Sequence, residues 1–234
     1  MTKHAILMSL ALSLVTLAPA LAQTNEPAEP APLAVFEGPA IQPGQEFDVR
    51  NYYPVAIGNW WKYQDTADNN VQFKLEIKKT VPVNGTTAAL FERSTKVETD
   101  AITTNADGML LHAQQRTNRD GSILATNWTP PVKFTDLKTK FGNKYSTTPS
   151  YTNPGTGNKM TWASTVVGVG DVTAGTNKFT NCVRIKVLVT DSVLGVKLCD
   201  FEMWVAKGIG VVQRQGNFFG VFFAQKVLEW QVKP

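Results

Sequence analysis

The acidic residues best spaced for chemistry are Asp200 and Glu202, in the stretch Asp200-Phe-Glu-Met-Trp204. On a β-strand, residues two apart project from the same face, so both carboxylates would lie beside Trp204. A carboxylate pair beside an aromatic ring is the arrangement expected of a glycan-acting site. The same stretch also fits a strand that ends or bulges there, which would turn the acids away from the buried face. The sequence leaves both interpretations open.

Other catalytic machinery is missing from the sequence. His112 is the one histidine beyond residue 22, and a single imidazole supplies neither a multi-histidine metal site nor a nucleophile with its base. The G-x-S-x-G and H-E-x-x-H motifs and the Walker loop are also absent. We therefore predict no catalytic residue, no metal site and no cofactor, and we favour a binding protein over an enzyme.

Aromatic residues offer a second kind of chemistry, the binding of apolar or sugar-like ligands. Residues 217–224 place phenylalanines on both faces of their strand, and both faces must be covered by a second layer, a partner chain or a bound apolar ligand. Tryptophans that are fully buried would instead be ordinary core. The candidate ligand-binding residues are Trp60, Trp61, Trp204, Phe218, Phe219, Phe222, Phe223 and Trp230.

The first 22 residues have the pattern of a secretory signal peptide. Lys3 supplies the basic region, residues 5–17 form an apolar run, and Ala20-Leu21-Ala22 is a small-residue cleavage site. The run is shorter than the roughly 18–20 residues that a membrane span needs, and Pro19 interrupts it. We therefore predict a secreted or periplasmic protein, peripheral at most to a membrane.

Composition divides the remaining chain into two parts. Residues 23–50 are rich in Pro, Ala and Glu without periodicity, which predicts an extended spacer or an unstructured leader. Residues 51–234 are long enough for one domain with its own core. The formal charge of +4 falls to +3 when Lys3 is removed, and the basic residues are scattered. Such a mild, dispersed charge argues against nucleic acid as a partner.

Strand signals dominate from residue 51 onward. Residues 71–78 alternate strictly between apolar and polar side chains, which predicts a half-buried strand. Asn84-Gly85, Asp107-Gly108 and Asp120-Gly121 accept positive φ between strand-like runs, so each predicts a hairpin. Residues 136–158 read as a long irregular excursion. The expected fold is all-β, an antiparallel meander of about eleven strands, near residues 59–65, 71–80, 86–98, 101–104, 109–116, 122–128, 131–136, 158–167, 178–190, 194–206 and 209–232, the last broken at Gly216-Asn217.

Cys182 and Cys199 lie on neighbouring predicted strands. If they faced each other, the apolar residues of the two strands would also pair, and in an oxidising compartment the thiols would join. That register opposes Arg184 to Lys197 and needs a two-residue turn without glycine. A shift of two residues gives a four-residue loop at 190–193 but makes the cysteines diagonal. From compartment and cysteine count we predict a structural Cys182–Cys199 disulfide.

Three segments carry a resemblance to a known family. They are Tyr52-Tyr-Pro-Val-Ala-Ile-Gly-Asn-Trp-Trp-Lys-Tyr63, Thr173-Ala-Gly-Thr-Asn-Lys-Phe-Thr-Asn-Cys182 and Trp204-Val-Ala-Lys-Gly-Ile-Gly-Val-Val-Gln-Arg214. They resemble the YYPLxxGNxWxY opener, AGxFxNC middle and AxGVGxVxR closer of an uncharacterised family of bacterial secreted β-proteins. The resemblance implies a single, strongly curved antiparallel sheet from residue 51 to the C-terminus, an open half-barrel similar to that of bacterial lipoprotein carriers. Asn177, Lys207 and Cys199 depart from the pattern, and the family carries over no catalytic residue.

These features predict a secreted or periplasmic, non-enzymatic binding or envelope-associated protein. The concave face of its sheet would hold an apolar small molecule, a lipid or a segment of an envelope protein. The alternative is a carbohydrate-binding module or glycan-acting site that uses surface tryptophans with Asp200 and Glu202. A third possibility, a purely structural surface protein, would have no pocket. Asp200→Asn separates the first two, because only the glycan enzyme would lose its activity.

Overall fold

The strand predicted at residues 71–78 forms as its alternation requires. In the computed structural model, which describes residues 33–117, 121–151, 160–218 and 220–233, Phe73 and Ile77 of β4 (Val71–Val83) are buried, whereas Gln72 and Lys78 are exposed. The predicted Asn84-Gly85 hairpin joins β4 to β5 (Thr86–Arg93), with both turn residues at positive φ. The alternation of side chains in β4 and the turn residues Asn84-Gly85 therefore both favour this hairpin.

The second predicted hairpin also forms. Ala106-Asp107 joins β6 (Thr99–Asn105) to β7 (Gly108–Thr117), one residue before the predicted dipeptide, and Gly108, the first residue of β7, has φ 113°. A Cβ at Gly108 would lie 1.9 Å from the carbonyl oxygen of Thr135, so this position accepts only glycine. The hairpin predicted at Asp120-Gly121 includes Asp120, which lies outside the described residues.

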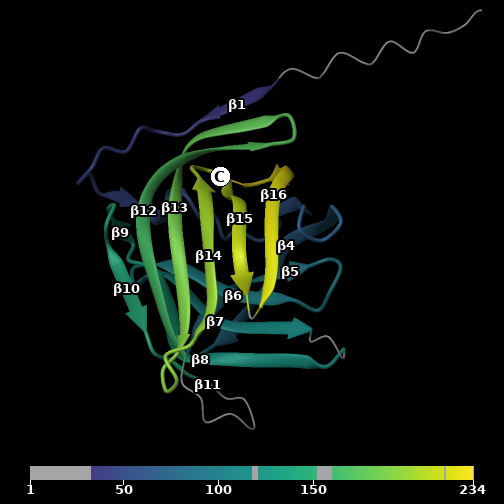
Figure 1. The fold of residues 1–234 in the computed structure, drawn as a ribbon. Helices are drawn as coiled ribbons and strands as arrows, with labels where there is room; N and C mark the ends of the chain where they lie inside the picture. The colour runs from purple at the N-terminus through teal and green to yellow at the C-terminus, as the bar shows by residue number, and fades with distance from the viewer. Residues whose placement is uncertain (1–32, 118–120, 152–159, 219, 234) are drawn as a thin grey trace, which may run out of the picture. The chain divides into compact units, whose positions relative to one another are not determined.

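The strands form one large sheet that is nearly closed into a barrel (Figure 1), which confirms the expected all-β fold. Its strand order is β10-β12-β13-β14-β15-β16-β3-β4-β5-β6-β7-β8-β11, and all neighbours on this path are antiparallel. Ser164 Oγ of β12 donates to the carbonyl oxygen of Phe134 in β8 at 2.5 Å, which joins the two ends of the sheet. The remaining elements are β1 (Ala34–Glu37), β2 (Phe47–Asp48), the 3-10 helix η1 (Val49–Asn51), β3 (Trp60–Asp65), β8 (Ile123–Thr135), β9 (Lys138–Thr139), β10 (Lys144–Thr147), β11 (Ser150–Tyr151), β12 (Met160–Ala174), β13 (Asn177–Asp191), β14 (Lys197–Ala206), β15 (Gly210–Phe218) and β16 (Val221–Gln231).

Two predicted strand boundaries are wrong for identifiable reasons. The strands predicted at 122–128 and 131–136 are one strand, β8, because Pro130 and Pro131 lie in a bulge opposite His112 that needs no ladder N–H. The segment predicted at 209–232 is two strands as expected, but the break comes after Phe218, where β15 ends, instead of at Gly216-Asn217. Gly216 stays in β15, where a Cβ would lie 2.3 Å from the carbonyl oxygen of Asp200.

The excursion predicted at residues 136–158 is only partly irregular. It contains three short strands, which pair with distant partners: β9 with β2, β10 with β12 and β11 with β8. Residues 152–159 lie outside the described part of the chain. Strands of two to four residues are too short to show a period, so the sequence pattern does not detect them.

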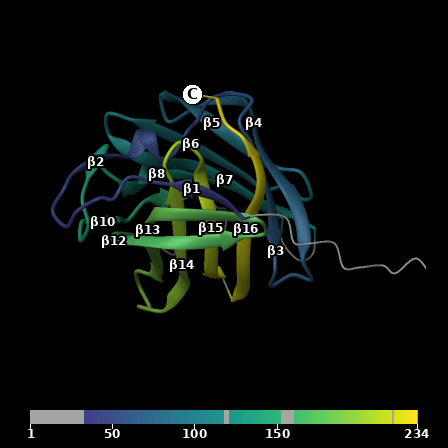
Figure 2. The same cartoon turned by 90° about the horizontal axis from the view of Figure 1, so that it is seen from above.

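Residues 33–50 fall within the predicted spacer, yet they pack on the sheet. β1 pairs in parallel with β13, with Phe36 opposite Phe179 (Figure 2). Ile41 and Val49 are buried in the core. The predicted signal peptide lies within residues 1–32, outside the described residues. No helix in the described part of the chain is long and apolar enough to cross a bilayer.

The predicted Cys182–Cys199 disulfide is wrong. Cys182 lies opposite Gly170 and Cys199 opposite Val189, so they stand seven residues apart along β13. That spacing is roughly 23 Å of strand, far beyond the reach of a disulfide. The hairpin loop spans residues 192–196, longer than either predicted turn. Asn181, at φ 53°, interrupts the alternation of β13, and the two residues after it, Cys182 and Val183, are both buried in the core.

Candidate functional site

The inner face of the sheet surrounds a cavity of about 1120 Å³. Its deeper wall is aromatic and apolar, and includes Trp61, Phe91, Trp128 and Trp162. These side chains come from four strands, β3, β5, β8 and β12, and each follows the inward phase of its strand alternation. Closure of the sheet is what brings them into one chamber.

The rings of β3 are held in fixed positions by the strand opposite. Trp61 stacks on Phe91 with ring centres 5.9 Å apart, and its indole N–H donates to the carbonyl oxygen of Ile209 at 2.6 Å. The Tyr63 hydroxyl donates to the carbonyl oxygen of Val211 at 2.6 Å, and burial raises the pKa of that hydroxyl. Trp61 and Tyr63 are therefore rigid parts of the cavity wall, and the polar atom of each is satisfied.

The cavity reaches solvent at one edge of the sheet, which we call the mouth. In an antiparallel sheet of this order, the β15–β16, β3–β4, β5–β6 and β7–β8 connections all lie at the same edge. Ala67 and Lys96 of these connections line the cavity and are exposed, as is Phe222 near the start of β16. The Phe222 side chain is 62% exposed, which is unusual for a large apolar group.

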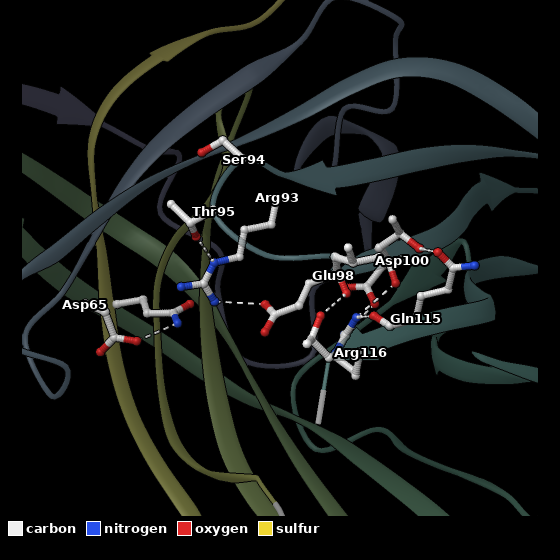
Figure 3. A network of polar contacts seen from close by, with 12 residues as sticks. Asp65, Arg93, Ser94, Thr95, Glu98, Asp100, Gln115 and Arg116 are labelled. Atoms are coloured by element: carbon white, nitrogen blue, oxygen red, sulfur yellow. Dashed lines mark hydrogen bonds and ion pairs between the residues drawn. The ribbon is translucent and has the colours of Figure 1, made fainter. Parts of the chain in front are cut away.

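One side of the mouth carries paired charges (Figure 3). Arg93 Nη1 lies 2.8 Å from Glu98 Oε2, and the Arg93 side chain is only 7% exposed. The guanidinium also donates to Thr95 Oγ1 at 3.0 Å and lies 3.8 Å from the centre of the Phe73 ring. The Arg93 guanidinium is therefore held by three protein groups and is largely buried at the cavity wall.

A second pair lies beside the first. Arg116 Nη2 is 2.6 Å from Asp100 Oδ1, and Arg116 Nη1 donates to the carbonyl oxygen of Thr99 at 2.9 Å. Both side chains line the cavity and are about three-quarters buried, with exposures of 26% and 22%. The two arginines and their acids cancel in charge, so this side of the mouth is polar and close to neutral.

The other side of the mouth is aromatic. Phe201 lies 6.4 Å from Phe218 and 6.0 Å from Phe223, measured between ring centres. All three line the cavity, and Val221 and Phe222 extend this surface outward. The mouth thus presents a charged side and an apolar side, which suits a ligand that has a polar part and an apolar part.

Four of the predicted ligand-binding residues line the cavity, and three others lie away from it. The four that line the cavity are Trp61, Phe218, Phe222 and Phe223. Phe219 lies outside the described residues.

The other predicted residues lie elsewhere. Trp60 donates its indole N–H to Gln231 at 3.0 Å on the outer face, and Trp204 is buried on that face beneath the Arg184 guanidinium at 5.5 Å. Trp230 packs against Phe36 of β1, with ring centres 4.9 Å apart. β1 is therefore the second layer that covers this end of β16.

The acid pair faces away from the cavity. Leu198 is the extra residue of a β-bulge opposite the Val189/Thr190 step, so Phe201 and Met203 face inward while Asp200 and Glu202 face outward. This is the bulge interpretation of the sequence.

Both acids are held by basic side chains. Glu202 pairs with Arg184 at 2.9 Å, and Asp200 pairs with Lys197 at 3.0 Å and Lys186 at 3.5 Å. The hydrogen bond from Lys197 lowers the pKa of Asp200. A glycosidase general acid needs the opposite shift, so Asp200 lacks the environment of that role.

His112 is buried and not on the sheet surface. Its Nε2 lies 2.9 Å from Thr103 Oγ1, and burial lowers the pKa of the imidazole. Within the described ranges, no group of three or more His, Cys, Asp or Glu side chains is arranged to hold a metal ion.

Sequence reasoning missed the cavity arginines, Arg93, Arg116 and Arg214. A signal was available for Arg93, which follows Phe91 on an alternating strand, so a charge continues the pattern of an apolar face. Arg214 gives no such signal, because a bulge between Val211 and Gln213 interrupts the alternation of β15.

No family model matches the chain, and no curated protein matches it. Two solved bacterial structures are similar to it. One is a "putative lipoprotein" from Parabacteroides distasonis ATCC 8503, with 12% identity, a TM-score of 0.32, and coverage of 77% of this chain and 99% of that chain. The other is a "putative exported protein" with a YmcC-like fold from Bacteroides fragilis NCTC 9343, with 11% identity, a TM-score of 0.33, and coverage of 77% and 98%. Because TM-scores in this range do not establish a shared fold, we base the function on the cavity itself.

Proposed function

We propose that this protein is a secreted or periplasmic binding protein that holds an apolar, lipid-type ligand inside its curved sheet. The observation that carries this proposal is the cavity of about 1120 Å³ with its aromatic wall. Ligand pockets commonly measure about 300–1,000 Å³ and are lined by apolar and aromatic side chains with a few polar groups. This cavity is slightly larger than that range, which leaves room for a long chain.

The mouth supports the same ligand class. Val221 and Phe222 are 51% and 62% exposed beside the opening, where water contact is unfavourable for them. A ligand that lies across Phe218 and Phe223 would remove apolar surface from water, at about 25 cal/mol for each Å² buried. We assign the ligand contacts to Trp61, Phe218 and Phe223, and we propose no catalytic role for Asp200 or Glu202.

The first experiment is native mass spectrometry with lipid extraction, on the chain secreted by a bacterial host. We expect a fatty acid or phospholipid to accompany the protein in stoichiometric amount. The secreted protein should also bind N-phenyl-1-naphthylamine, an uncharged apolar fluorescent probe. A protein that carries no lipid and does not bind the probe would overturn the proposal, and glycan arrays would then follow.

Two neighbouring residues of β8 provide a matched pair of variants. Leu124 lines the cavity, whereas Ile123 is 55% exposed on the other face. Leu124→Trp should lower probe affinity because it fills the mouth, and Ile123→Trp should leave it unchanged. Equal affinities in the two variants would place the binding site elsewhere. Asp200→Asn should bind the probe like the unmodified protein.

A further inference from the structure

Arg214 differs from the other arginines of the cavity because it has no acidic partner. Arg93 and Arg116 are each within 2.8 Å of a carboxylate. Arg214, by contrast, forms no ion pair with any residue that the structure describes. Its Cζ lies 6.0 Å from the centre of the Tyr63 ring at the cavity wall. Arg214 therefore presents to the cavity a guanidinium that no carboxylate of the described residues contacts directly, although Lys96, Asp65 and Asp68 line the same cavity.

A chain of hydrogen bonds orients this guanidinium. Arg214 Nε donates to Oε1 of Gln225, and Gln225 Nε2 donates to Asp65 Oδ2 at 2.7 Å. Asp65 is 5% exposed and also accepts the backbone N–H groups of Ala67 and Ala224, each at 3.1 Å. Arg214 is thus held through Nε, and its two terminal nitrogens are left for a ligand.

We propose that Arg214 binds the head group of the ligand and that this head group is a carboxylate, so the cavity accepts a long-chain monocarboxylic acid. The inference rests on the function proposed above and names its ligand class. A guanidinium and a carboxylate form two parallel hydrogen bonds, which fixes the head while the chain lies among the aromatic rings. Because the acids Asp65 and Asp68 line the same cavity, a head group with one negative charge fits beside Arg214 better than a phosphate monoester, which carries more.

The test is displacement of N-phenyl-1-naphthylamine by palmitate and by 1-hexadecanol at pH 8. The unmodified protein should bind palmitate more tightly than the alcohol. Arg214→Gln should weaken palmitate binding by roughly tenfold, the usual scale for a hydrogen bond to a charged group. Binding of the alcohol and of the probe should not change. Arg184→Gln, the same substitution on the outer face, should affect none of the three compounds.

Each outcome separates this inference from the proposed function. If Arg214→Gln binds palmitate like the unmodified protein while the probe still binds, the head-group assignment is wrong and the binding function stands. If the unmodified protein binds neither the probe nor palmitate, the binding function itself fails. If a lysophosphatidic acid depends on Arg214 and palmitate does not, the carboxylate assignment is overturned in favour of phosphate.

A second variant protects the test against misfolding. Arg214→Lys keeps the charge but loses the planar pair of donors, so palmitate affinity should fall between those of the unmodified protein and Arg214→Gln. Retained binding of the probe shows that the cavity is intact in either variant. An equal loss of palmitate and alcohol affinity in Arg214→Lys would contradict a role in head-group recognition.

Discussion

Gly216 is where a single added methyl group should do most damage near the mouth. Its φ of 147° lies outside the left-handed region that other residues tolerate. A Cβ would also lie 2.3 Å from the carbonyl oxygen of Asp200 and 2.5 Å from the Cα of Phe201. Both contacts are with backbone or its attached atoms, so β14 and β15 would have to move apart. Phe201 and Phe218, which form the aromatic side of the mouth, would move with them.

Gly208 supplies the control. It lies in the β14–β15 turn at φ 72°, and a Cβ there would meet nothing within 4 Å. Gly208→Ala should cost about 1–2 kcal/mol from the left-handed conformation alone. Gly216→Ala should cost about 1–3 kcal/mol more from overpacking. At about 3 °C of Tm per kcal/mol for a chain of this size, the Gly216 variant should melt about 3–9 °C below the Gly208 variant.

The assay is thermal unfolding followed by circular dichroism, with probe binding measured on the folded variants. Gly216→Ala should also bind N-phenyl-1-naphthylamine less tightly, because the Phe201–Phe218 contact changes. If the two variants melt together, β14 and β15 do not approach as closely as the structure has them, and the reasoning fails.

Two predictions concern buried titratable groups. Burial raises the pKa of the Cys182 thiol to about 12, so iodoacetamide at pH 8 should leave the native protein unmodified. It should add two groups after unfolding without reductant, and a need for reductant would reveal a disulfide. The lowered pKa of His112 means that the unfolded chain binds the extra proton first, so stability should fall as pH drops below roughly 6.5. His112→Gln should lose part of that slope in urea unfolding at pH 5.5 and 7.5, and an unchanged slope would exclude His112 as its source.

Much of the fold could be predicted from local patterns. The alternation of Phe73 and Ile77 with polar neighbours was enough for β4, and Asn84-Gly85 was enough for its hairpin, because both signals depend only on residues close in sequence. The disulfide was wrong because the register depends on where the hairpin loop falls. The loop spans residues 192–196, so Cys199 pairs with Val189, seven residues along β13 from Cys182, and the bulge at Leu198 moves this register by only one residue.

The site was predictable only in part. Trp61 and Phe223 were chosen for their size and do line the cavity, whereas Trp60 and Trp230 have the same character and lie outside it. Which face of a strand becomes concave depends on how the whole sheet curls. Neighbouring aromatic residues on one strand cannot reveal it.

The sequence by itself determined that this chain is an all-β protein, because side-chain period and turn residues act over a few positions. The tertiary structure alone decided what the strands surround. Barrel closure brings β3, β5, β8 and β12 around one chamber, and the hydrogen bonds of Gln225 place Arg214 at its wall. Gln225 and Asp65, for example, are 160 positions apart, and the register of the strands between them determines that they meet.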